Sequence, residues 1–177
     1  EGVNPWGVFD EFLLNRCINV MNEKDKNTPI FISLFTTTNH LPWIIPEKYD
    51  NENNLLIPNY SSDKKTPFLS SKRTMKYVDI VLEDFFSNAK KQDWFENTIF
   101  IITADHGLNI FNDNINDPKN GHIPLLIYNT SLEPIKIDKI ISQIDILPTT
   151  LDLINKKSDY IDLFGCSGFK GDKGYAF

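Results

Sequence analysis

The stretch that decides the fold is Thr98-Ile99-Phe100-Ile101-Ile102-Thr103-Ala104-Asp105-His106-Gly107. Its first six residues are all β-branched or aromatic, which predicts a strand that is buried on both faces. Residues 30–35 and 123–128 have the same apolar character and predict two further strands. Pro124 is compatible with the last of these, because the start of a strand tolerates the loss of a ladder hydrogen bond.

Amphipathic helices are predicted between the strands. Apolar side chains recur at helical spacing in residues 9–22 and from Val78 to Ala89. A further helix is expected near Pro148, a residue favoured at the first helical position, with Asp145 close enough to help cap it. The first helix is predicted to bury the side chains of Phe9, Phe12, Leu13, Cys17, Val20 and Met21. The second is predicted to bury those of Val78, Leu82, Phe85, Phe86 and Ala89.

Helix and strand signals alternate from residue 9 to residue 155. This order argues for an α/β fold, an α/β/α sandwich with a largely parallel central sheet. Residues 47–72 are polar and turn-rich, and such a long excursion is expected to cover or border a site. We expect residues 1–177 to be a partial domain, because the chain begins without Met and ends without the character of a tail.

The composition is that of a globular protein, with 41% hydrophobic and 24% charged residues among 177 and a net charge of −6. Scattered lysines make up most of the 18 cationic residues, so we expect no nucleic-acid partner. No apolar run approaches the ~20 residues that span a bilayer. Two cysteines cannot form a disulfide framework, and Cys17, within a helical pattern, is expected to be a buried structural thiol.

Candidate ligands follow two of the predicted strands. Asn39-His40 comes soon after the strand at 30–35, and Asp105-His106 comes directly after the strand at 98–103. Sites in open α/β sheets gather beyond the carboxyl ends of the strands, so these residues are expected at one edge. A carboxylate oxygen and an imidazole nitrogen suit Zn²⁺ or Mn²⁺, which makes Asp105 and His106 candidate metal ligands.

Each candidate also has a purely structural interpretation. Asp105 could turn the chain while His106 bonds locally, and the two side chains can share a metal only if the chain turns there, which Gly107 permits. His40 could hold a substrate anion or transfer a proton, or it could be a surface histidine in a proline-rich loop. His122 precedes a strand, and in a parallel sheet it would lie at the opposite edge, so a peripheral role is expected for it.

Segments along the chain, taken together in their order, resemble the sulfatase branch of the alkaline phosphatase superfamily. Residues 98–107 resemble its metal-binding strand, and residues 123–128 followed by 142–153 resemble the strand and helix that come next. Trp6-Gly7-Val8-Phe9-Asp10 and Thr37-Thr38-Asn39-His40-Leu41-Pro42 are similar to segments of the lipoteichoic acid synthase and phosphoglycerol transferase group. The resemblance covers residues 5 to about 165 and implies that the chain is the C-terminal portion of a sulfatase-like catalytic domain.

The resemblance implies roles for three residues. Asp105 and His106 would bind one divalent cation, Mn²⁺ or Zn²⁺, and His40 would contact the phosphoryl or head group of the substrate. The group's threonine nucleophile and first acidic metal ligand lie upstream of this region, and no segment here matches either. No catalytic nucleophile is therefore assigned, and the chain alone is expected to be inactive.

The implied activity is transfer of a lipid head group, such as that of phosphatidylglycerol, to a polymer or glycan acceptor. The parent protein would act at the extracytoplasmic face of the cell membrane, held by an anchor upstream of this chain. A sulfatase that hydrolyses sulfuric esters is an alternative, and so is a catalytically inactive relative kept as a binding domain. The intact pair Asp105-His106 argues against the inactive alternative, and the Asn-His-Leu-Pro context of His40 favours the transferase.

Overall fold

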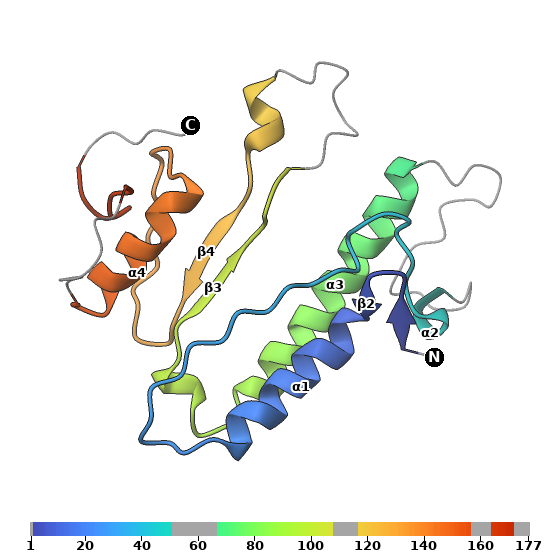
Figure 1. Cartoon of the computed structure of the whole chain (residues 1–177), viewed down its shortest axis with the longest axis horizontal. Helices are drawn as coiled ribbons and strands as arrows, with labels where there is room; N and C mark the ends of the chain where they lie inside the picture. The colour runs from blue at the N-terminus through green and yellow to red at the C-terminus, as the bar shows by residue number, and fades with distance from the viewer. Residues whose placement is uncertain (1, 51–66, 108–116, 157–163, 172–177) are drawn as a thin grey trace. The chain divides into compact units, whose positions relative to one another are not determined.

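The computed structural model of the chain describes residues 2–50, 67–107, 117–156 and 164–171. The chain divides into two compact units, Glu1–Ser131 and Leu132–Phe177. Helices and strands are both present, in agreement with the predicted α/β class (Figure 1). Among the described helices, none combines the length and the apolar character that crossing a lipid bilayer requires.

Two helices, α1 (Asp10–Glu23) and α3 (Pro67–Ala89), lie side by side in the first unit (Figure 1). Both predicted helices are confirmed, but the predicted buried face of the first is wrong in part. Phe12 is 47% exposed, whereas Leu14 and Ile18 are buried together with Asp10. The inward face of the helix includes its first residue, Asp10, whose carboxylate accepts hydrogen bonds from two backbone amides.

The core of the first unit forms mainly between these two helices and the chain that follows them. On α3 the buried apolar positions recur every four residues from Tyr77 to Ala89, which is the spacing of one helix face. The core comprises Phe9, Leu14, Ile18, Ile45, Tyr77, Val81, Phe85, Ala89 and Phe95. Cys17 is half-buried and packs against this core, and burial raises the pKa of its thiol. The predicted structural role of Cys17 therefore agrees with its position.

The strands β3 (Phe100–Thr103) and β4 (Leu125–Tyr128) pair antiparallel, with Thr103 opposite Leu125. Both predicted strands are confirmed, but this pair does not show the parallel relation that was predicted for the sheet. A parallel pair needs a crossover from one end of the sheet to the other. Here the chain leaves β3 at Thr103 and enters β4 directly opposite, so the two strands run in opposite directions.

Aromatic side chains attach this strand pair to α3. The ring centroid of Phe100 on β3 lies 5.1 Å from that of Phe86 on α3 and 5.3 Å from that of Phe95, in a short 3₁₀ helix at Phe95–Asn97. Tyr128 on β4 lies 5.8 Å from Phe86. These contacts hold the Phe100 end of the pair against the core. The opposite end, at Thr103, leads to Asp105 and His106.

Residues 30–35 are extended, but they form no strand with the described residues. Phe31 and Phe35 are 90% and 79% exposed, while Leu34 packs against the core. The prediction of a strand buried on both faces is therefore wrong for this structure. One face contacts the core, and the described part of the chain provides no layer to cover the other.

The N-terminal residues form a short antiparallel hairpin, β1 (Val3–Asn4) with β2 (Gly7–Val8), and α2 spans Glu47–Asp50. Of the predicted polar excursion at 47–72, residues 51–66 lie outside the described part of the chain. α3 already begins at Pro67, well before the predicted apolar positions.

In the second unit, α4 (Ile146–Leu153) follows a 3₁₀ turn at Gln143–Asp145 and confirms the predicted helix. Asp145 precedes the helix, but its carboxylate does not cap α4 as predicted. It accepts hydrogen bonds from the backbone N of Ser142 (2.8 Å) and of Cys166 (2.7 Å) instead. Asp145 therefore joins the start of α4 to the later chain at Cys166, which is exposed and unpaired.

Candidate functional site

The end of β3 fixes the backbone that carries Asp105 and His106. The hydroxyl of Thr103 donates to the carbonyl of Pro124 at 2.9 Å, just before β4 begins. Thr103, the last residue of β3, is thus held by its pairing with Leu125 on β4 and by this side-chain hydrogen bond to the residue before it. The chain then turns, and Oδ1 of Asp105 accepts from the backbone N of His106 at 2.9 Å.

Asp105 and His106 are brought together at this turn. Oδ2 of Asp105 lies 3.7 Å from Nε2 of His106, and both side chains are largely exposed. Nδ1 of His106 lies 2.8 Å from the carbonyl of Gly107, an acceptor, so Nδ1 carries the hydrogen and the lone pair of a neutral ring is on Nε2. The local hydrogen bonds expected if Asp105 and His106 had a purely structural role are therefore present. The same bonds also orient both side chains.

This donor set fits a divalent cation. Zinc ligands at about 2.1 Å in a tetrahedral arrangement lie about 3.4 Å from one another, close to the 3.7 Å between Oδ2 and Nε2. A hydrogen bond from Nδ1 to a carbonyl is also the usual outer partner of a histidine that binds a metal through Nε2. Within the described residues, no group of three or more His, Cys, Asp or Glu side chains completes such a site.

Gly107 is required here by close packing. A Cβ at this position would lie 1.8 Å from the carbonyl oxygen of Asn120 and 3.7 Å from that of His122. The segment before β4 therefore lies directly against the Asp105-His106 turn. The prediction that His122 lies at the opposite edge is wrong, because β4 is antiparallel to β3 and begins at the end where β3 stops.

The second candidate, His40, is exposed on a loop made of two successive turns. The backbone N of His40 donates to Thr37 O at 3.1 Å, and the backbone N of Trp43 donates to His40 O at 2.9 Å. The indole N–H of Trp43 also donates to Asn39 O at 3.1 Å. These bonds give the loop a defined path. None of the contacts above joins His40 to the Asp105-His106 pair.

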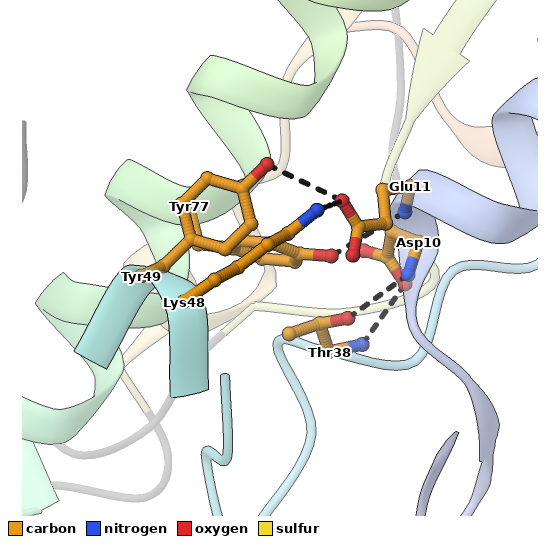
Figure 2. Close-up of polar contacts among 6 residues, drawn as sticks. All are labelled: Asp10, Glu11, Thr38, Lys48, Tyr49 and Tyr77. Atoms are coloured by element: carbon orange, nitrogen blue, oxygen red, sulfur yellow. Dashed lines mark hydrogen bonds and ion pairs between the residues drawn. The ribbon is translucent and has the colours of Figure 1, made fainter. Parts of the chain in front are cut away.

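The start of α1 holds the beginning of this loop. Oδ1 of Asp10 accepts from the backbone N of Thr37 at 3.0 Å and of Thr38 at 3.2 Å, and Asp10 is 1% exposed. Figure 2 shows the carboxylate of Asp10 directed at Thr38. Asp10 belongs to the Trp6–Asp10 motif, but the sequence predicted no role for it. The one signal for it in the sequence is an acidic residue at the start of an apolar helix.

Trp6 contacts His40 directly. The two ring centroids lie 4.1 Å apart with planes tilted by 54°, and the indole N–H of Trp6 donates to Leu41 O at 2.5 Å. Nδ1 of His40 lies 3.0 Å from the same carbonyl. This contact could not be predicted from the sequence, because nothing in the spacing relates residue 6 to residue 40.

A group of polar side chains that is only partly buried adjoins Asp10 (Figure 2). Glu11 accepts from Lys48 at 2.5 Å and from the hydroxyl of Tyr49 at 3.3 Å, and its backbone N donates to the hydroxyl of Tyr77 at 3.4 Å. The bond to Glu11 raises the pKa of Lys48, and burial raises the pKa of Tyr49 and, much further, that of Tyr77. This group ties α1, α2 and α3 together.

Comparison with curated proteins finds relatives among lipoteichoic acid synthases. The chain is 26% identical to the lipoteichoic acid synthase-like protein YvgJ of Bacillus subtilis (strain 168), over 95% of this chain and 29% of that protein. It is 27% identical to lipoteichoic acid synthase 1 of the same organism, over 81% of this chain and 24% of that protein. The chain thus spans less than a third of the length of either relative.

Comparison with solved structures finds proteins that have a similar fold. The chain is similar to a protein of the alkaline phosphatase superfamily from Vibrio parahaemolyticus, with a TM-score of 0.76 and 35% identity over 96% of this chain and 39% of that one. The lipoteichoic acid synthase LtaP from Listeria monocytogenes gives a TM-score of 0.80 over 95% of this chain and 44% of that one; at 20% identity it shows the fold alone. The family profile described as Sulfatase matches residues 1–156. The chain therefore belongs to the sulfatase family, within the alkaline phosphatase superfamily.

Proposed function

We propose that the parent protein is a metal-dependent transferase that moves a phosphoglycerol head group from a phospholipid such as phosphatidylglycerol to a polymer or glycan acceptor. The chain described here would be the C-terminal portion of its catalytic domain. The names of the curated relatives, which are lipoteichoic acid synthases, support this activity. The parent would act at the extracytoplasmic face of the membrane, held by an anchor outside this chain.

One observation carries the proposal: the 3.7 Å separation of Asp105 Oδ2 and His106 Nε2 at the end of β3. We assign these two atoms as ligands of one divalent cation, Mn²⁺ or Zn²⁺, with the remaining ligands from outside this chain. A bound cation of this kind lowers the pKa of a hydroxyl nucleophile and neutralises charge on phosphoryl oxygens. The nucleophile is a threonine upstream of this region.

His40 is assigned to the head group of the substrate. Its side chain is exposed on an ordered loop, and an imidazole can donate a hydrogen bond to a phosphoryl oxygen. Because it lies outside the pair that would bind the metal, its removal should affect substrate affinity more than metal content.

The experiment uses the full-length protein and three variants, Asp105→Ala, His106→Ala and His40→Ala. Metal content is measured by plasma mass spectrometry, and transfer from phosphatidylglycerol is measured in mixed micelles. We expect the first two variants to lose most of the metal and at least about a hundredfold in kcat. His40→Ala should keep its metal and raise KM. A full metal content in Asp105→Ala would falsify the ligand assignment.

A sulfuric ester hydrolase is the second candidate, favoured by the Sulfatase profile that matches residues 1–156. The same preparations distinguish the two functions when an aryl sulfate replaces phosphatidylglycerol. Turnover of the sulfate alone would establish the second candidate. Turnover of neither substrate, with metal still bound, would support an inactive relative that acts by binding.

A further inference from the structure

We propose that Trp6 is a positioning residue for His40, and that it orients the imidazole toward the anionic head group of the substrate. The inference rests on the proposed role of His40 and goes beyond it, because it assigns a function to the Trp6–Asp10 motif. It is carried by two contacts that Trp6 makes with the loop, one to the ring of His40 and one to the carbonyl of Leu41.

The ring contact restricts the position of the imidazole. At a centroid distance of 4.1 Å and a tilt of 54°, the indole lies against the His40 ring. Aromatic pairs in such tilted arrangements are favourable, and the attraction increases when the imidazole is protonated and becomes a cation over the indole. An exposed histidine without such a neighbour would sample several rotamers.

The carbonyl contact selects one tautomer. Leu41 O accepts from Nε1 of Trp6 at 2.5 Å and lies 3.0 Å from Nδ1 of His40. A carbonyl oxygen only accepts, so Nδ1 must carry a hydrogen. Within the described residues, Nε2 makes no hydrogen bond and is the ring nitrogen that can meet a ligand. Protonated, Nε2 donates to a phosphoryl oxygen.

Trp6 is itself held in place by the N-terminal hairpin. Oδ1 of Asn4 accepts from the backbone N of Trp6 at 2.8 Å and of Gly7 at 3.0 Å. The amide of Asn4 donates to Oγ1 of Thr37 at 3.2 Å, in the segment that leads to the His40 loop. Trp6 is nevertheless 58% exposed, so core packing does not explain a large aromatic residue at this position.

The test is a double-mutant cycle in the full-length protein with phosphatidylglycerol in mixed micelles. The variants are Trp6→Ala, His40→Ala and the pair, with Trp6→Phe as a conservative form that keeps the ring and loses the N–H. Trp94→Phe is the matched control, because its indole N–H donates at 2.7 Å to Asn22, away from the His40 loop. Thermal melts verify that each variant is folded.

We expect Trp6→Ala to raise KM about tenfold with kcat changed less than about twofold, and Trp6→Phe to raise it about threefold. The pair should be no worse than His40→Ala, because Trp6 acts through His40. Additive effects, or no effect of either Trp6 variant on KM, would overturn the positioning role and leave His40 intact. A normal KM in His40→Ala would refute the proposed contact itself, and the inference with it.

Discussion

The carboxylate of Asp10 lies 3.0 Å from the backbone nitrogen of Thr37 and accepts its hydrogen, and the same oxygen accepts from Thr38 at 3.2 Å. This relationship joins residues 27 positions apart. It fixes the start of the His40 loop to the first residue of α1. Because Asp10 is 1% exposed, the two amides are held by a charged acceptor that is protected from solvent competition.

Replacing Asp10 by Ala should release this loop. The two amides would lose their acceptor, and the cost is about 2–4 kcal/mol for buried, charge-assisted bonds. Amide hydrogen exchange followed by mass spectrometry of the full-length protein should show at least about tenfold faster exchange at Thr37 and Thr38. Asp10→Asn keeps one acceptor oxygen and should have a smaller effect. Asp79→Ala, which removes an exposed ion pair with Lys76, is the control.

Unchanged exchange in Asp10→Ala, with Asp79→Ala also unchanged, would show that the loop is held by its own turns. The two tryptophans that bond Asn39 O and Leu41 O would then be sufficient for its order.

Gly107→Ala should disrupt the Asp105-His106 pair. The added Cβ would lie 1.8 Å from a backbone carbonyl oxygen, at Asn120, so the turn itself must move. We expect at least about a tenfold loss of bound metal, since a ligand displaced by 1 Å no longer meets the coordination distances. Gly121→Ala is the matched control, because nothing lies within 4 Å of its added Cβ. Equal metal content in both variants would contradict the placement of the pair.

The fold could be predicted as far as local patterns determine it. The helix α1 and the strands β3 and β4 were predicted within a few residues, because helical spacing and β-branched runs are local signals. The helix α3 was predicted at its end but not at its start, since it begins at Pro67 within the stretch predicted to be a polar excursion. The direction of β4 relative to β3 could not be predicted, since it depends on where the chain turns after Thr103. Residues 30–35 show the same limit: their pattern predicts burial, but burial needs a second layer, which the described residues do not provide.

The residues of the candidate site could be predicted from their chemistry, but the contacts that hold them in place could not. Asp105 and His106 were identified because their residue types suit a metal and they follow a strong strand. The turn that carries this pair packs through Gly107 against Asn120, and the ring of His40 packs against Trp6. Both contacts join segments that are distant in sequence. A single sequence does not reveal such contacts. The buried carboxylate of Asp10 was missed for the same reason.

Thr149→Val should destabilise the second unit more than Thr150→Val. The hydroxyl of Thr149 accepts from the backbone N of Gly168 at 2.8 Å, and Thr149 is 1% exposed. The hydroxyl of Thr150 donates to Ile146 O, within its own helix. Valine has nearly the shape of threonine. The difference in the free energy of unfolding between the two variants therefore measures the cost of leaving the Gly168 amide without its acceptor, about 1–3 kcal/mol. Hydrogen exchange at Gly168 should quicken in the first variant alone, and equal exchange in both would contradict this role of Thr149.

Tyr77 should make the stability of the first unit fall at alkaline pH. The side chain is 0% exposed, and burial raises its pKa well above the ordinary value of about 10. Above pH 10 the unfolded chain loses the phenolic proton while the folded chain keeps it. The stabilisation is therefore complete below pH 10 and decreases by up to about 1.4 kcal/mol per pH unit above it.

Unfolding by urea at pH 8, 10 and 11 measures this slope in the full-length protein. Tyr77→Phe has no phenolic proton, so its stability should fall less steeply between pH 10 and pH 11. Some slope should remain, because the pKa of Lys48 is raised by its bond to Glu11 and that of Tyr49 by burial, and both act in the same direction. An identical slope in wild type and Tyr77→Phe would show that Tyr77 gains access to solvent before the unit unfolds.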